Sequence, residues 1–136
     1  MMRFVALGAL LASAVAMPVS AGVRDYRIAN EHKILGEFVD LLAIPNVAAD
    51  TPNIRRNAQA LMAMMEKRGL SPRLLEGADS TTPPIVYGEW KVPGAKKTIV
   101  LYAHYDGQPT VPAKWTASPP WQPTLRTRAI EAGGTV

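Results

Sequence analysis

The sequence predicts an α/β fold made of two helices followed by a mixed sheet. Residues 24–43 and 51–69 carry apolar side chains three or four positions apart, as amphipathic helices do. After Gly69 the period changes, and short runs of β-branched and aromatic residues alternate with turn residues. With 136 residues in all, the chain holds one domain at most.

The first helix is expected from Arg24 to Ala43. Acidic and basic side chains lie between its apolar positions, which are Ile28, Leu35, Phe38, Val39 and Leu42. Pro45 follows the helix and ends it, because proline disfavours helical geometry in the residue before it. His32 stands between Glu31 and Lys33 on the polar side, so we expect its side chain to be solvated.

The second helix is expected to begin with Thr51 as its N-cap and Pro52 at the first helical position. Gly69 predicts its end, because it follows two basic residues at the end of the periodic stretch. The side chains expected to be buried are Ile54, Ala58, Leu61, Met62 and Met65. Methionines at 62, 64 and 65 keep this spacing, which favours core packing over soft metal binding.

Three strands are expected next, at residues 71–75, 85–92 and 98–105. Residues 93–96 have the composition of a hairpin turn, which would make the last two strands antiparallel neighbours. The run Thr98–Ala103 is almost uninterrupted in its apolar character. That pattern predicts a central strand buried on both faces of the sheet.

His104 and Asp106 stand at the carboxyl end of this third strand. Side chains two residues apart in an extended backbone point to the same face, and open α/β sheets bind ligands at that edge. The histidine could bind a divalent metal with the carboxylate orienting it, or act as a general base held by the carboxylate. A third interpretation is a histidine that only hydrogen-bonds a loop carbonyl, since the pattern His-x-Asp is short.

The strand and the loop after it resemble the dizinc aminoacylase and carboxypeptidase family of metallopeptidases. The matching residues are Ile99-Val-Leu-Tyr-Ala, His104-Tyr-Asp-Gly-Gln-Pro, Lys114-Trp115 and Ser118-Pro-Pro-Trp-Gln-Pro-Thr-Leu-Arg126. The family includes acetylornithine and succinyl-diaminopimelate deacetylases and dipeptidases of the carnosinase type. The dipeptidase-like branch is the most similar.

The resemblance implies the amino-terminal part of a three-layer, zinc-exopeptidase-like catalytic domain with two zinc ions, although other divalent metals are possible. His104 would be a terminal metal ligand, and Asp106 the acid that clamps and polarises that imidazole. The implied reaction is hydrolysis of an amide bond in a dipeptide or N-acyl amino acid. Acidic pairs and a second histidine, expected downstream in the family, do not occur before Val136. We therefore expect residues 22–136 to be an incomplete, inactive part of a longer protein, which could be a homodimer.

Residues 1–21 are expected to form a signal peptide. Met1–Arg3 give a basic start, Phe4–Ala16 an apolar run of 13 residues, and Val19-Ser20-Ala21 a small-x-small cleavage site. A membrane anchor is the alternative, but the run is shorter than the roughly 20 residues that a spanning helix needs. The protein would then be secreted or periplasmic, without stable membrane association after cleavage.

The charge pattern and the lack of cysteine exclude further classes of protein and of metal site. Basic residues are scattered or paired, and removal of Arg3 lowers the net charge from +4 to +3, so no nucleic-acid surface is indicated. The absence of cysteine excludes disulfides and thiolate ligands.

The sequence also bears on two rival classes. It contains neither Gly-x-Ser-x-Gly nor His-Glu-x-x-His, the motifs of two other hydrolase classes. The remaining alternative is an exported, non-catalytic ligand-binding module that uses Trp115 and Trp121 of the proline-rich loop. These tryptophans are expected either to pack the loop down or to line a pocket.

Overall fold

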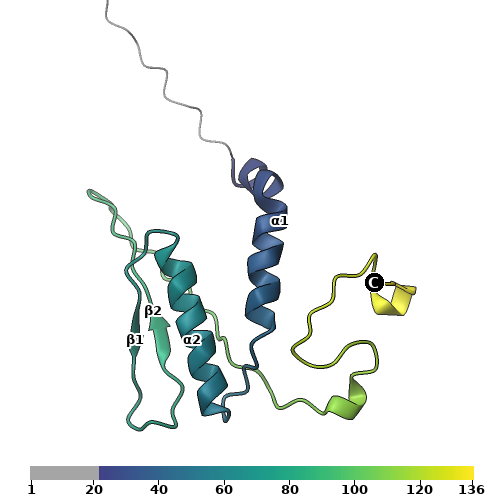
Figure 1. Ribbon diagram of the computed structural model, residues 1–136. Helices are drawn as coiled ribbons and strands as arrows, with labels where there is room; N and C mark the ends of the chain where they lie inside the picture. The colour runs from purple at the N-terminus through teal and green to yellow at the C-terminus, as the bar shows by residue number, and fades with distance from the viewer. Residues whose placement is uncertain (1–21) are drawn as a thin grey trace, which may run out of the picture. The chain divides into compact units, whose positions relative to one another are not determined.

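The computed structural model describes residues 22–136 (Figure 1), so the predicted signal peptide at residues 1–21 lies outside the described residues. The chain divides into two compact units, one ending at Glu31 and one running from His32 to Val136. Each unit is described by itself. Within residues 22–136, no helix has both the length and the apolar character that crossing a membrane requires.

Helix α1 runs from Val23 to Leu42, within one residue of its predicted ends. Arg27 and Glu31, four residues apart on its exposed surface, form an ion pair at 2.8 Å that stabilises the helix. None of its residues is buried, so the predicted apolar stripe, including Phe38, lacks a full cover among the described residues. His32 is exposed, as predicted.

Helix α2 runs from Thr51 to Glu66, and its N-cap is Asp50. The Asp50 carboxylate accepts a hydrogen bond from the backbone N–H of Asn53 at 3.3 Å. The prediction of Thr51 as the N-cap was therefore wrong by one residue, because the preceding carboxylate satisfies the free N–H of the first turn. Gly69 follows with a φ of 77°, a left-handed conformation that suits glycine at a helix end.

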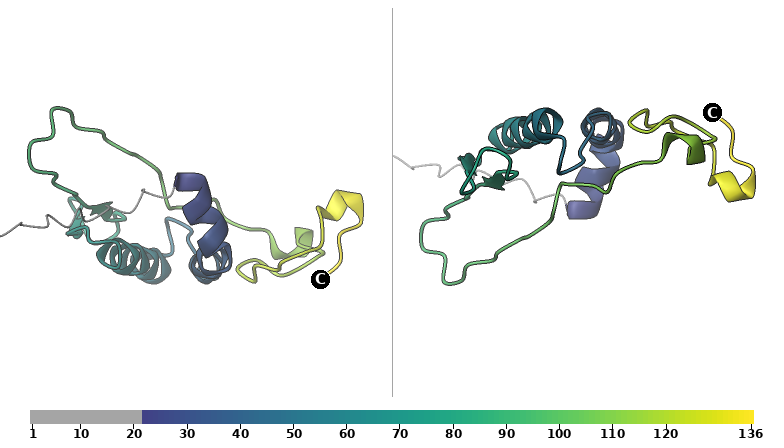
Figure 2. Two further views of the ribbon diagram at one scale, coloured as in Figure 1. Left: turned by 90° about the horizontal axis from the view of Figure 1, so that it is seen from above. Right: turned by 90° about the horizontal axis from the view of Figure 1, so that it is seen from below.

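The predicted apolar stripe of α2 forms the small core of the second unit. Ile54 and Ala58 are fully buried, and Leu61, Met62 and Met65 are half-buried. The methionines thus serve packing, as predicted. Strand β2 contacts this helix, and the views from above and below both place α2 beside the two strands (Figure 2).

The sheet has two antiparallel strands, β1 (Arg73–Leu75) and β2 (Ile85–Tyr87). Its register pairs Leu74 with Val86 at the centre. The α/β class is confirmed, but two details of the sheet prediction were wrong. The second predicted strand pairs with the first and not with the third, and the described sheet is antiparallel instead of mixed.

The third predicted strand, residues 98–105, belongs to no sheet in the described part of the chain. Leu101 is 92% and Tyr102 90% exposed, so this run is the opposite of a buried central strand. The turn at residues 93–96 does form, with the N–H of Ala95 donating to the carbonyl of Val92 at 3.1 Å. The run is extended but unpaired, because a strand needs a partner backbone and none of the described residues supplies one.

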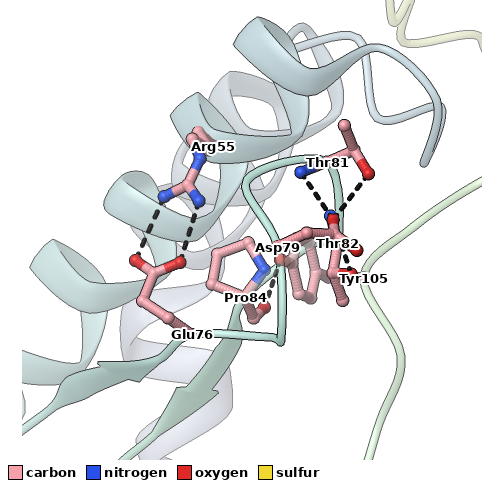
Figure 3. A network of polar contacts seen from close by, with 7 residues as sticks. All are labelled: Arg55, Glu76, Asp79, Thr81, Thr82, Pro84 and Tyr105. Atoms are coloured by element: carbon pink, nitrogen blue, oxygen red, sulfur yellow. Dashed lines mark hydrogen bonds and ion pairs between the residues drawn. The ribbon is translucent and has the colours of Figure 1, made fainter.

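Two ion pairs connect the helices to other parts of the second unit. Arg55 of α2 makes a two-pronged contact with Glu76, at 3.1 and 2.8 Å, in the loop after β1 (Figure 3). Arg68, just beyond α2, pairs with Glu37 of α1. The hydrogen bond from Arg68 lowers the pKa of Glu37 from its ordinary value of 4.5, and the one from Arg55 does the same for Glu76.

These shifts predict a loss of stability in acid. A carboxyl group with a lowered pKa in the folded state contributes fully above its unfolded pKa, here about 4.5. The contribution is lost as the pH falls through the folded pKa values, because the unfolded chain takes up protons first. We expect the urea midpoint, followed by helical circular dichroism, to fall as the pH drops below this value.

The double variant Glu37→Gln, Glu76→Gln is the matched control for this prediction. It should have a lower midpoint at neutral pH and a shallower fall in acid. An unchanged pH profile in the double variant would mean that other groups cause the acid loss.

Candidate functional site

The side chains of His104 and Asp106 meet, although no strand carries them. The ring nitrogen Nδ1 of His104 lies 3.0 Å from the backbone oxygen of Asp106 and 3.3 Å from its carboxylate oxygen Oδ1. Both neighbours are hydrogen-bond acceptors, so they favour the tautomer that carries its hydrogen on Nδ1. This tautomer leaves the lone pair on Nε2.

The pair is open to solvent. The His104 side chain is 76% exposed and that of Asp106 47% exposed. An exposed Nε2 lone pair with an acceptor behind Nδ1 is the arrangement by which a histidine ligates a metal. A general base held by a carboxylate has the same arrangement, so the geometry excludes neither chemical use.

Tyr105, between these two residues, anchors the segment to the rest of the unit. Its hydroxyl donates a hydrogen bond to the carbonyl of Pro84, next to β2 (Figure 3). Partial burial raises the pKa of Tyr105, and the negative charge of Asp106 raises it further. The phenol therefore stays a neutral donor and keeps its bond to Pro84.

Asn46, in the loop after α1, holds the same segment from another side. Its side-chain amide donates to the carbonyl of Tyr105 at 3.1 Å, and its backbone carbonyl accepts from the N–H of Gly107 at 2.8 Å. Val47 and Gly107 form an isolated parallel bridge at this point. The sequence pattern did not indicate a role for Asn46. The only indication of this contact was Gly107, because glycine permits close approach of another backbone.

His104 and Asp106 together account for one ligand position of a metal site. Within residues 22–136, no group of three or more histidine, aspartate or glutamate side chains is placed to hold a metal ion. Zinc ordinarily takes three or four protein ligands. Residues 22–136 therefore offer one imidazole with its orienting carboxylate, and His32 does not join them.

The two tryptophans of the proline-rich loop differ in their surroundings. Trp115 is half exposed, whereas Trp121 is more buried and has a φ of 61°, which is rare for a bulky residue. Arg126 organises this loop by donating to the carbonyls of Ala117 and Gly134, at 3.0 and 3.2 Å. Packing of the loop thus accounts for Trp121 better than for Trp115.

The chain is similar to two curated proteins. Cys-Gly metallodipeptidase dug1 from Schizosaccharomyces pombe is 34% identical over 98 residues, covering 61% of this chain and 21% of the relative. Cys-Gly metallodipeptidase DUG1 from Candida albicans is 29% identical over 92 residues, covering 58% of this chain and 19% of the relative. No family model matches the chain, and no solved structure matches it.

The chain spans about a fifth of the length of the curated relatives that it matches. The names of these relatives describe enzymes that use a metal and act on a dipeptide. This similarity agrees with the metallopeptidase resemblance of the segment around His104. The chain is therefore similar in sequence to metal-dependent dipeptidases.

Proposed function

We propose that this chain supplies one metal-binding histidine, His104, and its orienting carboxylate, Asp106, to a metal-dependent dipeptidase. The contact of Nδ1 with the backbone oxygen and the carboxylate oxygen Oδ1 of Asp106 carries the proposal, because it leaves Nε2 of an exposed ring able to bind a cation. The similarity to Cys-Gly metallodipeptidases supports the reaction class. The remaining ligands would belong to other parts of a longer protein.

Each residue has a separate task in this proposal. His104 presents Nε2 to the metal, while Asp106 accepts the hydrogen on Nδ1 and fixes the direction of the ring. Tyr105 and Asn46 hold the backbone from which both side chains project. A bound divalent metal, with two zinc ions as our expectation, would polarise the scissile carbonyl and lower the pKa of water from about 15.7 to roughly 7.

The substrate class we propose is a dipeptide or an N-acyl amino acid. Both present an amide bond, and the dipeptide agrees with the names of the relatives. Export to the periplasm or the outside of the cell belongs to the same proposal. It depends on the basic start, apolar run and small-residue site within residues 1–21.

Asp106→Asn in the longer protein tests the orienting role. We expect the metal content to stay nearly unchanged while hydrolysis falls roughly 10–100-fold, the usual cost of losing an outer-shell partner. Metal analysis and assays with Cys-Gly and an N-acetyl amino acid measure the two quantities. Asp25→Asn, an exposed acid on α1, is the control and should change neither.

A variant Asp106→Asn with the activity of the unaltered protein would refute the orienting role. Full metal content with no hydrolysis of either substrate by the unaltered protein would instead refute the proposed reaction. The two failures are therefore distinguishable.

A further inference from the structure

Two peptide units flank Asp106, and Asn46 contacts both of them. The unit between Tyr105 and Asp106 offers its carbonyl to the side-chain amide of Asn46, at 3.1 Å. The unit between Asp106 and Gly107 offers its N–H to the backbone carbonyl of Asn46, at 2.8 Å. A single residue thus fixes the backbone on both sides of the carboxylate.

The second of these peptide units is also the one that His104 uses. The backbone oxygen of Asp106, 3.0 Å from Nδ1 of His104, lies in the same plane as the N–H of Gly107. The backbone carbonyl of Asn46 accepts the hydrogen bond from the Gly107 N–H. The Asp106 carbonyl, at the opposite edge of the same planar peptide unit, therefore has a fixed direction. The hydrogen bond from Nδ1 then has a fixed acceptor.

The residue before Asn46 is hydrogen-bonded to helix α2. Asn57 of α2, only 3% exposed, donates to the carbonyl of Pro45 at 2.6 Å and to that of Asn53 at 3.1 Å. The loop that carries Asn46 is therefore docked on α2. These hydrogen bonds tie Asn46, and through it the backbone around Asp106, to helix α2.

Gly107 permits the close approach that this arrangement needs. A Cβ atom at this position would lie 2.5 Å from the side-chain oxygen of Asn46. Any larger residue would therefore force the Asn46 side chain or the backbone at position 107 to move. The contacts of Asn46 with this segment therefore depend on glycine at position 107.

We propose that Asn46 is the positioning residue of the His104–Asp106 pair and selects the tautomer with hydrogen on Nδ1. The consequence for metal binding rests on the proposed function, whereas the tautomer does not. Removing the Asn46 amide frees the Tyr105–Asp106 peptide, and replacing it with a carboxylate sets two acceptors against each other. Both variants keep the backbone hydrogen bond from Gly107 to Asn46 but loosen the peptide on the other side of Asp106, so Asp106 is held from one side only and its contact with Nδ1 of His104 weakens.

Nitrogen-15 NMR of the histidine rings tests this directly in the 136-residue chain. At a pH where imidazoles are neutral, we expect His104 to carry its hydrogen mainly on Nδ1, with His32 as the internal reference. In Asn46→Asp and Asn46→Ala, the ratio of the two tautomers should shift toward Nε2–H by roughly three- to tenfold, as for one lost hydrogen bond. A purely structural role would lower helix content and leave this ratio unchanged.

Asn30→Ala and Asn30→Asp are matched controls. Asn30 also donates its side-chain amide to a backbone carbonyl, that of Tyr26, at 2.8 Å, and it lies on α1. Its variants should leave the His104 ratio unchanged. An unaltered ratio in both Asn46 variants, with helix content preserved, overturns the proposal, and a shift in Asn46→Ala alone supports it if Asn46→Asp fails to fold.

Addition of Zn²⁺ to the longer protein, labelled in the same way, separates this inference from the proposed function, because residues 22–136 alone offer a single imidazole ligand. If Zn²⁺ leaves the Nε2 resonance of His104 in the unaltered longer protein unmoved while the Asn46 variants still shift the tautomer ratio, metal binding fails and the positioning role stands. If Zn²⁺ moves that resonance while the Asn46 variants leave the ratio unchanged, metal binding stands and the positioning role fails.

Discussion

Replacing His104 with alanine in the longer protein is expected to remove bound metal and reduce hydrolysis by roughly three orders of magnitude or more. A metal site has three or four ligands, so loss of one imidazole weakens binding and removes the Lewis acid on which the reaction depends. Metal content per chain, measured by plasma mass spectrometry, and hydrolysis of Cys-Gly give the two readouts. Both should fall together.

The two readouts also separate the chemical uses of His104. If the metal stays and only turnover is lost, His104 acts as a general base held by Asp106. If metal and turnover both survive, His104 does not belong to the site. His32→Ala is the matched control, because His32 is the only other histidine among these 136 residues and is exposed on α1.

Features set by neighbours in sequence could be predicted without the structure. Both helices lie where the apolar spacing places them, and α2 buries Ile54 and Ala58 as predicted. His104 and Asp106 could be selected because their contact spans only two residues. The N-cap error at Thr51 has the same local origin, since Asp50 and Thr51 are both capping residues and the pattern alone does not choose between them.

Features that need a distant partner could not be predicted. Asn46 lies 59 residues before Tyr105, so no spacing rule connects the two. The run at residues 98–103 has the composition of a strand, but pairing depends on which backbone lies beside it. The sequence pattern reports a preference for burial, and the described fold leaves that preference unsatisfied.

The same run leads to a prediction about association of the isolated chain. Residues 98–103 are β-branched, aromatic or apolar and contain no charge, proline or glycine. Exposed segments of this composition pair with copies of themselves. The aromatic and aliphatic side chains at the centre of the run, including Tyr102 at 90% exposure, are open to such pairing.

Leu101→Lys is expected to raise the concentration at which the 136-residue chain begins to associate by roughly tenfold. Removing one leucine from an apolar contact costs about 1.5–3 kcal/mol, and a lysine in the run opposes edge-to-edge pairing. Sedimentation velocity over a concentration series measures the effect, and all variants share residues 1–21. Leu125→Lys is the control, because Leu125 is 76% exposed but lies outside the run. An equal gain from both variants would assign association to exposed apolar surface in general, and no gain from Leu101→Lys would exclude the run as the contact.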